Sequence, residues 1–248
     1  MSLPTLVAHR GHARCFPENT LASLTAALEA GARRVEIDVQ LSADRTPFLF
    51  HDGDTARACG RGGQFGELSD TEVHELRVRE PDRFGERFPD EPVCSLARFA
   101  ALLAEYPRAR AFVEVKPEAV ERFGAGAVLS AVSAALGAVG ERCELISFSL
   151  ELLAAARAAA TGELGLILEC WSDLESDVAR ALACEYTFCN VEKLPADADL
   201  GGRGTRFVLY EVVDAALALD LHRRGAEFIE TFAWPELTAT LAALGTES

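Results

Sequence analysis

The sequence predicts an α/β fold, specifically a closed (β/α)8 TIM barrel with a short insertion after its second strand. Short runs rich in β-branched and aromatic residues alternate along the chain with runs rich in Ala and Leu, and eight of the β-like runs follow this alternation. Strands that alternate with helices pair in parallel, and eight such strands form a barrel. The length of 248 residues suits one barrel, and no linker or repeat interrupts it. We therefore expect a single domain over residues 1–248.

The composition of each run indicates its secondary structure. The expected strands, in order, are Thr5–His9, Arg34–Leu41, Ala111–Lys116, Cys143–Phe148, Glu163–Glu169, Tyr186–Val191, Arg206–Val212 and Ala226–Thr231. The expected helices between and after them are Leu21–Glu29, Leu96–Glu105, Glu118–Val139, Leu150–Ala160, Leu174–Ala183, Asp214–Arg224 and Pro235–Leu244. Asn19 or Thr20 is expected to cap the helix that begins near Leu21.

One apolar run, Pro47–Phe50, does not fit this alternation. Only residues 42–46 separate it from the strand before, whereas a parallel crossover needs a dozen or more residues. We therefore expect it to return antiparallel, as a hairpin arm. With the following stretch rich in Gly, Arg and acidic residues, it makes an inserted hairpin and loop segment at about residues 45–94. Such insertions in barrel enzymes lie at the C-terminal mouth, so we expect this one to frame a site, with a simple surface loop as the alternative.

The strand VEIDVQL at residues 35–41 alternates apolar and acidic side chains. Residues two apart on a strand point the same way, so Glu36 and Asp38 share one face, while Val35, Ile37 and Val39 share the other. In a barrel surrounded by helices, the outward residues must be apolar. The two acids therefore point inward, where burial is costly unless a cation meets them.

The next expected strand repeats this pattern in AFVEVK. By the same reasoning Glu114 and Lys116 point inward beside Glu36 and Asp38. Three inward carboxylates on neighbouring strands suit a hard divalent cation, Mg²⁺ or Ca²⁺, as the cofactor. The alternative is a structural salt bridge in which Lys116 is the partner of an acid.

Two histidines stand at strand ends, where catalytic groups of barrel enzymes lie. His9 ends the first strand beside Arg10, and His51 ends the hairpin arm. A phosphodiester needs its charge neutralised, which Arg10, Lys116 and a metal can do, and it needs an acid and a base, which two imidazoles can supply near neutral pH. A lone histidine at a strand end is more often structural. The remaining histidines lack such company and are expected at the surface: His12, His74 and His222.

The composition limits the partners and the compartment. The net charge of −15 argues against nucleic acid, since phosphate backbones attract basic surfaces. No apolar stretch reaches the roughly 18 residues of a membrane span, and the N-terminus does not read as a signal peptide. Seven scattered cysteines without a C-x-x-C pair are typical of a reducing compartment. We expect a cytoplasmic protein, monomeric or homodimeric, that acts on a small molecule.

These motifs together resemble one family. HRGHARCFPENT, VEIDVQLSADRTPFLFHD and VEVKP carry the H-R-G, P-E-N-T, E-x-D, H-D and E-x-K elements of glycerophosphodiester phosphodiesterases, in that order and at similar spacing. The resemblance implies metal-dependent cleavage of glycerophosphodiesters to an alcohol and glycerol phosphate, a reaction of lipid and glycerol metabolism. It implies His9 and His51 as general acid and base, and Arg10 and Lys116 as phosphate-binding residues. It also implies a divalent cation on the three inward acids, namely Glu36, Asp38 and Glu114.

The P-E-N-T element at residues 17–20 also has a local interpretation, because it precedes a helix. We expect it to be chiefly architectural, with Glu18 and Asn19 as candidates for orienting the residues of the site.

The second half of the chain departs from the family pattern. Tyr210–Val213 stand where the pattern reads W-T-V-N, and Glu230–Ala233 stand where it reads T-D-x-P. Acids and aromatics fall together at three expected strand ends, a set that suits a cationic head group. Ordinary loop and capping chemistry is the alternative. The pairs are Glu169 with Trp171, Glu211 with Tyr210, and Glu230 with Trp234, and Tyr210 is the substrate-binding candidate among them.

Three other functions remain open on the sequence. A phospholipase D of the sphingomyelinase type has a similar two-histidine barrel, but such proteins resemble secreted ones with disulfides. A metal-dependent aldolase or isomerase also uses inward acids, but it does not require the His-Arg pair. A non-catalytic barrel that binds phosphate esters is the third.

Overall fold

The computed structural model describes residues 3–246. Its strands are β1 (Thr5–His9), β2 (Arg34–Leu41), β3 (Pro47–Leu49), β4 (Arg110–Val115), β5 (Cys143–Ser147), β6 (Leu164–Ile167), β7 (Tyr186–Asn190), β8 (Arg206–Tyr210) and β9 (Phe228–Thr231). Its α-helices are α1 (Leu21–Glu29), α2 (Ala56–Cys59), α3 (Asp70–Glu75), α4 (Pro81–Phe84), α5 (Leu96–Glu105), α6 (Pro117–Phe123), α7 (Ala125–Leu136), α8 (Leu150–Ala158), α9 (Asp177–Leu182), α10 (Ala215–Arg223) and α11 (Trp234–Thr246). Short 3-10 turns are η1 (Phe65–Glu67), η2 (Gly137–Arg142), η3 (Trp171–Glu175) and η4 (Val191–Lys193).

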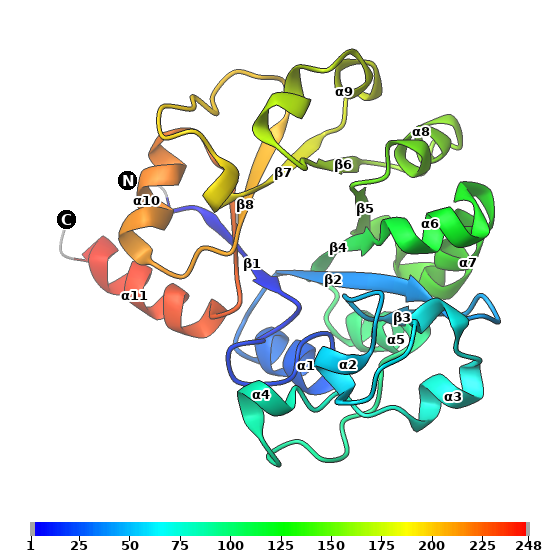
Figure 1. The fold of residues 1–248 in the computed structure, drawn as a ribbon. Helices are drawn as coiled ribbons and strands as arrows, with labels where there is room; N and C mark the ends of the chain where they lie inside the picture. The colour runs from blue at the N-terminus through cyan, green and yellow to red at the C-terminus, as the bar shows by residue number, and fades with distance from the viewer. Residues whose placement is uncertain (1–2, 247–248) are drawn as a thin grey trace.

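Eight parallel strands close into a barrel. Hydrogen-bonded neighbours follow the order β1-β9-β8-β7-β6-β5-β4-β2, and β1 pairs with β2 to complete the ring. Figure 1 shows this ring with the larger helices outside it. The predicted (β/α)8 barrel is confirmed, and its closure brings the first and last strands of the chain side by side.

The helix boundaries agree with the predicted ones at α1 and α5, are shifted by one or two residues at α8, α10 and α11, and differ more at two other places. The helix expected over Glu118–Val139 is two helices, because Gly124 adopts φ 78° and ends α6 before α7 begins. The helix expected over Leu174–Ala183 is the turn η3 followed by the short helix α9, whose N-terminus is capped by the side chain of Ser176. Thr20, rather than Asn19, caps α1, since its side chain accepts a hydrogen bond from the Ser23 backbone.

The two faces of β2 are divided as the alternation predicts. Val35, Ile37 and Val39 are fully buried and pack in one cluster with Leu96 and Phe99 of α5, outside the barrel. A separate cluster fills the barrel interior with side chains from seven of the strands: Val7, Phe112, Ile146, Ile167, Tyr186, Phe188, Val208 and Phe228. Glu36 and Asp38 therefore point away from the helices.

A charged cluster closes the N-terminal end of the barrel, opposite the mouth. Arg34 Nη1 donates to Glu144 at 3.0 Å, and Arg110 Nε donates to the same carboxylate at 2.8 Å. The Arg34 guanidinium lies over the Phe112 ring at 4.5 Å and the Phe228 ring at 5.1 Å. Glu144 is 2% exposed, so this end of the barrel is held by a buried, fully paired carboxylate.

The inserted segment begins as the predicted hairpin. β3 pairs antiparallel with β2, with Leu49 opposite Val39. The residues that follow form α2, η1, α3 and α4, which gather beside β2 and β3 on one side of the barrel (Figure 1). They have a small core of their own, in which the Phe50 and Phe65 rings stack 4.7 Å apart. This packing holds the end of the hairpin arm, and with it His51, against the barrel.

Within residues 3–246, no single helix combines the length and apolarity that a membrane crossing needs. One bent pair, Pro117–Phe123 with Ala125–Arg142, meets that test by length and composition only. All seven cysteines are free thiols.

Candidate active site

Strand register brings the predicted site residues together at the carboxyl ends of β1, β2 and β4. His9 lies opposite Glu36 in the β1–β2 ladder, and Asp38 lies opposite Glu114 in the β2–β4 ladder. A pocket of about 200 Å³ opens there. Seven of the eight predicted site residues line it: His9, Arg10, Glu36, His51, Glu114, Lys116 and Tyr210. The eighth, Asp38, is fully buried beside them.

The three predicted metal ligands form one cluster. Glu36, Asp38 and Glu114 each offer a carboxylate oxygen, and these oxygens all lie within 4.8 Å of one another. Burial raises the pKa of Glu36 and of Glu114, and the neighbouring Asp38 raises that of Glu36 further. The buried Oε1 atom of Glu36 has no hydrogen-bond partner among the described residues. Hard oxygen donors, clustered charge and an unpartnered oxygen together fit a divalent cation such as Mg²⁺ or Ca²⁺.

Two cations border this cluster. Arg10 Nε lies 3.0 Å from Asp38, and Lys116 Nζ lies 2.6 Å from Glu114 and 3.4 Å from Asp38. Burial opposes ionisation of Asp38, but the charges of Arg10 and then Lys116 hold its pKa below the usual range. Arg10 adopts a left-handed backbone, and so does Gly11, where a Cβ atom would lie 2.5 Å from the Ser23 backbone. The glycine of the H-R-G motif therefore lets the chain turn sharply and aim Arg10 at the site.

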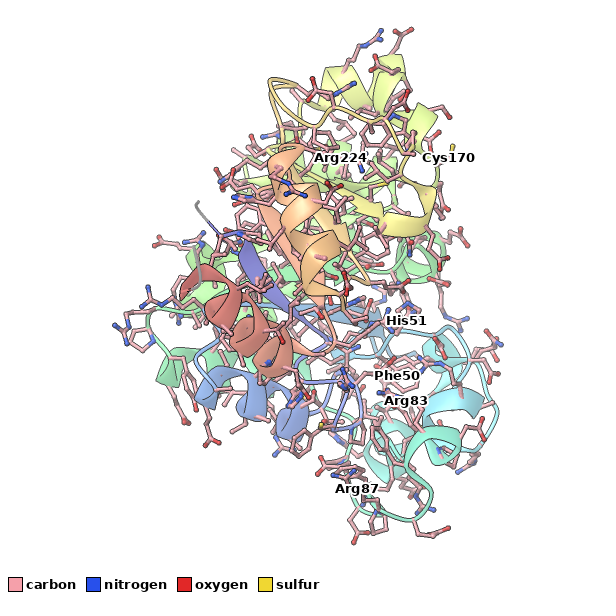
Figure 2. All side chains as sticks on the ribbon, turned by 90° about the vertical axis from the view of Figure 1, so that its left-hand side faces the viewer. Phe50, His51, Arg83, Arg87, Cys170 and Arg224 are labelled. Atoms are coloured by element: carbon pink, nitrogen blue, oxygen red, sulfur yellow. The ribbon has the colours of Figure 1, made fainter. Side chains whose placement is uncertain are left out.

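His51 is held by a carboxylate that the sequence analysis did not single out. Its Nδ1 atom lies 2.6 Å from Oδ1 of Asp52. Arg57 donates hydrogen bonds to both oxygens of that carboxylate, at 2.6 and 3.0 Å. Although partial burial opposes it, hydrogen bonds from His51 and Arg57 lower the pKa of Asp52, so Asp52 is an acceptor and His51 Nδ1 is the donor. The Nε2 atom of His51 is therefore the one left for a substrate. Figure 2 shows His51 and Phe50 where the insertion meets the barrel, with Arg83 and Arg87 farther out.

His9 is buried deeper, with 4% of its surface exposed. Its Nε2 atom lies 3.2 Å from Oε1 of Glu230 and 3.7 Å from Oε2 of Glu36, and its ring stacks on Phe232 at 4.3 Å. Burial, and then the charge of Arg10, lowers its pKa. Nδ1 of His9 and Oε2 of Glu230 are buried without hydrogen-bond partners among residues 3–246. Unpartnered buried polar atoms are costly, so their concentration at one pocket points to a bound ligand.

The residues of the P-E-N-T element reach the site as well as capping α1. Asn19 Nδ2 donates to Asp38 at 2.8 Å, and the Asp38 backbone N–H donates back to Asn19 Oδ1 at 3.1 Å. Glu18 bridges Arg10 at 3.1 Å and Arg57 at 2.6 Å. The element therefore orients one carboxylate and one arginine of the site, in addition to its architectural role.

The acid and aromatic residues of the second half separate into two groups. Tyr210, Glu211 and Glu230 line the pocket, together with Phe148 and Phe188. The other members of the predicted set lie elsewhere, which corrects that part of the expectation. Trp171 packs on Phe207 outside the barrel. Trp234 is the first residue of α11, and its indole N–H donates to the Leu6 carbonyl. Glu169 is exposed. A strand end alone does not decide whether the residues after it turn toward the mouth.

Three residues that contact the predicted site residues were not predicted to do so from the sequence. Asp52 is the second residue of the H-D motif, so its position next to His51 in the sequence indicated a possible contact with that histidine. Nothing in the sequence pointed to Arg57, because its contact with Asp52 depends on the fold of α2. Glu230 was noted as an acid near the mouth, but its contact with His9 depends on the pairing of β1 with β9.

Comparison with known proteins agrees with this arrangement. A family model described as the glycerophosphoryl diester phosphodiesterase family matches residues 9–193. Glycerophosphodiester phosphodiesterase 1 of Rattus norvegicus is 36% identical over 90 residues, which are 36% of this chain and 27% of that protein. A glycerophosphodiester phosphodiesterase of Caldanaerobacter subterraneus subsp. tengcongensis is 32% identical over 100 residues, 40% of each chain. These matches span less than half the length of either relative.

Solved structures share the fold over nearly the whole chain. A phosphodiesterase of Oleispira antarctica, in complex with the product sn-glycerol-3-phosphate, superposes with a TM-score of 0.84 at 24% identity and covers 97% of both chains. A glycerophosphodiester phosphodiesterase of Agrobacterium tumefaciens superposes with a TM-score of 0.75 at 24% identity, covering 97% of this chain and 100% of that one. Because the family model covers well over half of the residues, the chain belongs to the glycerophosphoryl diester phosphodiesterase family.

Proposed function

We propose that this protein hydrolyses glycerophosphodiesters to glycerol 3-phosphate and an alcohol. The observation that carries the proposal is that one pocket gathers two histidines, two fixed cations and a cluster of three carboxylates. Each part has a use in breaking a phosphate diester, and an aldolase or isomerase would not need all of them. Membership of the family supports the same reaction.

The cation belongs to the carboxylate cluster. Glu36, Asp38 and Glu114 would hold Mg²⁺ or Ca²⁺, which when bound would neutralise charge on the phosphate and polarise its P–O bonds. Arg10 and Lys116 lie on the same cluster and carry permanent positive charge, so they bind the non-bridging phosphate oxygens. Lys116 also keeps Glu114 in place through its hydrogen bond of 2.6 Å.

The two histidines move the protons. One takes the proton from the oxygen that attacks phosphorus, which is that of water or of the neighbouring glycerol hydroxyl. The other gives a proton to the departing alkoxide as its bond to phosphorus breaks, so the alcohol leaves neutral. If the glycerol hydroxyl attacks, the first product is a cyclic phosphate, and water then breaks one P–O bond of the ring to give glycerol phosphate. Each transfer contributes on the order of 10²–10⁴ in rate. Asp52 orients His51 and Glu230 orients His9, which keeps both rings in place before the substrate arrives.

The alcohol is assigned to the part of the pocket lined by Tyr210 and Glu211. The Glu211 carboxylate accepts a hydrogen bond from Asn190 at 2.8 Å. A carboxylate beside an aromatic ring favours a cationic head group such as choline. The head-group preference that the sequence suggested therefore rests on Tyr210 and Glu211, because Glu230 contacts His9.

Release of glycerol 3-phosphate from a mixed panel of glycerophosphodiesters tests the proposal. The reactions contain Mg²⁺, Ca²⁺ or EDTA, and the wild type is run beside His51→Ala. We expect metal-dependent release that the substitution lowers by at least about 10²-fold. His74→Ala is the matched control, because His74 is exposed on the insertion away from the pocket.

No release from any diester with any metal would overturn the proposal in favour of a phosphate-ester binding barrel. Equal release in the wild type and in His51→Ala would refute the role of the histidine while leaving the hydrolysis intact. Choline released from choline phosphodiesters together with a product other than glycerol 3-phosphate would indicate a phospholipase D-like reaction.

A further inference from the structure

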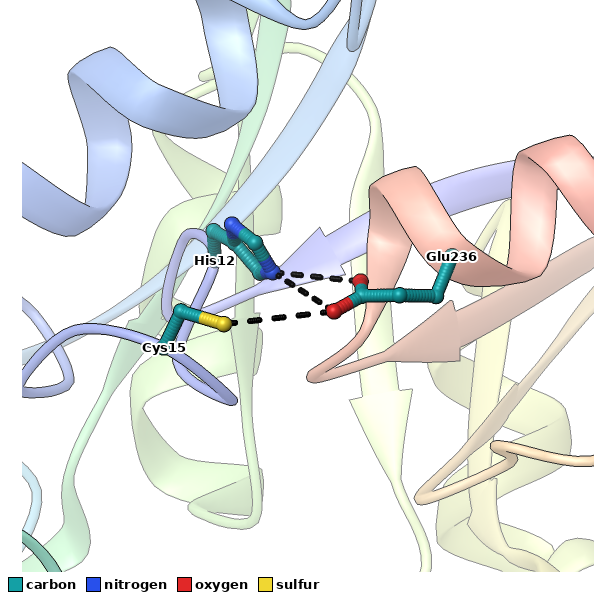
Figure 3. Close-up of side chains that lie close together, drawn as sticks. All are labelled: His12, Cys15 and Glu236. Atoms are coloured by element: carbon teal, nitrogen blue, oxygen red, sulfur yellow. Dashed lines mark hydrogen bonds and ion pairs between the residues drawn. The ribbon is translucent and has the colours of Figure 1, made fainter.

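A second cluster of metal-binding side chains lies outside the pocket. His12 and Cys15 come from the loop between β1 and α1, and Glu236 comes from the first turn of α11 (Figure 3). His12 had been expected to be an isolated surface residue. It is instead largely buried, with 12% of its side chain exposed, and it faces the Glu236 carboxylate.

The distances within the cluster are close to those around a small metal ion. His12 Nε2 lies 3.1 and 3.3 Å from the two oxygens of Glu236, and Cys15 Sγ lies 3.9 Å from Glu236 Oε1. All three ligand atoms lie within 4.8 Å of one another. Bonds of about 2.0 Å to nitrogen and oxygen and about 2.3 Å to sulfur, at tetrahedral angles, separate the ligand atoms by about 3.3–3.6 Å. Small side-chain movements would therefore bring the donors onto one ion.

The backbone holds the ligands of the loop in place. The Cys15 and Phe16 backbone N–H groups both donate to the His12 carbonyl, forming a turn that brings His12 and Cys15 together. The Arg14 N–H donates to the Phe232 carbonyl at 2.9 Å, which ties this loop to the segment leading into α11. The loop and the helix are thus positioned before any ion arrives.

We infer that His12, Cys15 and Glu236 form a binding site for a borderline or soft divalent transition cation such as Zn²⁺, separate from the carboxylate cluster of the pocket. One thiolate, one imidazole and one carboxylate favour Zn²⁺ over Mg²⁺ or Ca²⁺, which prefer oxygen ligands alone. Glu236 is 44% exposed, so the ion has a path from solvent and water can complete its coordination. The thiol proton passes to solvent when the sulfur binds.

The Arg14 guanidinium would compete with a metal ion for the Glu236 carboxylate. Arg14 Nε lies 3.9 Å from Glu236 Oε1, but its side chain is 59% exposed and makes no shorter ion pair there. An exposed contact of this length contributes little, so the arginine can turn outward into solvent as the ion binds.

The site would fasten two segments that also shape the pocket. The loop begins directly after His9 and Arg10, and the segment before α11 contains Phe232, on which the His9 ring stacks. A bound ion would join the loop to the helix across residues more than 220 positions apart in the chain. Its expected effect is therefore to stiffen one wall of the pocket, without contributing a ligand to the pocket itself.

Cobalt titration of the full chain tests the site, because Co²⁺ replaces Zn²⁺ in tetrahedral sites and gives a near-ultraviolet charge-transfer band when a thiolate binds it. The titration is run with saturating Mg²⁺, which would occupy the carboxylate cluster under the proposed function. We expect the band in the wild type with one equivalent of Co²⁺, and its loss on adding Zn²⁺. Cys15→Ser abolishes the band, and His12→Gln weakens Co²⁺ binding at least about tenfold.

Cys170→Ser is the matched control. Cys170 is an exposed thiol, whereas Cys15 is half-buried, and it too lies beside an acid, Asp173. Figure 2 shows Cys170 at the surface, far from His51. We expect this variant to keep the band, and to keep the rise in melting temperature that Zn²⁺ causes by binding the folded state. The absence of a band at millimolar Co²⁺ in the wild type would overturn the inference. A band that survives in Cys15→Ser would overturn it as well, and would leave His12 and Glu236 as an ordinary ion pair.

Discussion

The Nδ1 atom of His51 lies 2.6 Å from Oδ1 of Asp52, the next residue in the chain. Arg57 holds both oxygens of that carboxylate, so the aspartate is fixed from the opposite side. The histidine ring is therefore oriented by residues of the insertion, while the residues that we propose to bind the phosphate and the metal belong to the barrel.

Asp52→Asn tests whether this contact matters for turnover. An amide can donate a hydrogen bond to Nδ1, which would stabilise the wrong tautomer of His51. We expect kcat to fall by about 10²-fold with little change in KM, measured by steady-state release of glycerol 3-phosphate. Asp197→Asn, at an exposed aspartate that does not line the pocket, should match the wild type. A change in KM alone would mean that Asp52 contacts the substrate instead.

Glu230→Gln tests the contact behind the other histidine. The carboxylate lies 3.2 Å from His9 Nε2, and its loss would let the ring shift in the pocket. We expect kcat to fall by about 10- to 100-fold, because small misplacements of a reacting group are costly. Glu227→Gln is the control, since Glu227 is exposed just before β9. Unchanged kcat with a raised KM would assign Glu230 to substrate binding rather than to positioning.

Glu211→Gln tests the preference for a cationic head group. Loss of one partly exposed charge should raise KM for glycerophosphocholine by about two- to fivefold, a size typical of exposed ion pairs. KM for a diester with an uncharged alcohol should not change. Kinetics on the two substrates in parallel would decide this, and an equal rise for both would contradict the preference.

Glu144→Ala tests the closed end of the barrel. The substitution leaves Arg34 over the Phe112 ring without its buried partner, and unpaired buried charges cost about 3–5 kcal/mol. We expect a loss of that order in the free energy of unfolding, measured with urea. Glu185→Ala removes the more exposed pair with Arg157 and the hydrogen bond that Glu185 accepts from the Leu164 backbone, and it should cost less than Glu144→Ala. Similar losses in both variants would show that burial adds nothing at Glu144.

The dependence of stability on pH follows from the lowered pKa of Asp52. A carboxyl group whose pKa is lower in the folded state stabilises the fold above its unfolded pKa, about 3.9, and that stabilisation is lost as the pH falls further. Wild type should therefore lose stability more steeply than Asp52→Asn below about pH 4. Urea unfolding at several acidic pH values measures the two slopes, with Asp197→Asn following the wild type. Parallel slopes would mean that Asp52 gains nothing from His51 and Arg57.

Much of the fold could be predicted from local sequence patterns. The alternation of strands and helices predicted the barrel, and the spacing from residue 41 to residue 47 predicted the antiparallel hairpin, because both depend on periods and distances along the chain. The break at Gly124 was missed, since a glycine inside an apolar helical pattern does not reveal that it will adopt a positive φ. The turn η3 was missed as well, because its last two residues, Leu174 and Glu175, favour helices and were assigned to the helix that follows.

The part of the candidate site that depends on the alternation of side chains along a strand could be predicted from the sequence. Glu36, Asp38, Glu114 and Lys116 were expected to point inward because their apolar neighbours had to face helices, and the structure places them in one cluster. The two tryptophans near the mouth were misjudged for the opposite reason. They follow strand ends, and beyond a strand end no periodicity decides which way a side chain turns.

The sequence by itself determined the barrel, the inward acids and the pairing of two histidines with an arginine and a lysine, because these follow from periods of two and 3.6 residues and from the chemistry of phosphate. Only the tertiary structure decided which residues touch them: Glu230 on His9, Arg57 on Asp52, and Glu236 beside His12 and Cys15. The physical reason is barrel closure and loop packing. The closure of β9 onto β1 and the folding of the insertion against the hairpin bring together side chains whose separation along the chain carries no information about their distance in space.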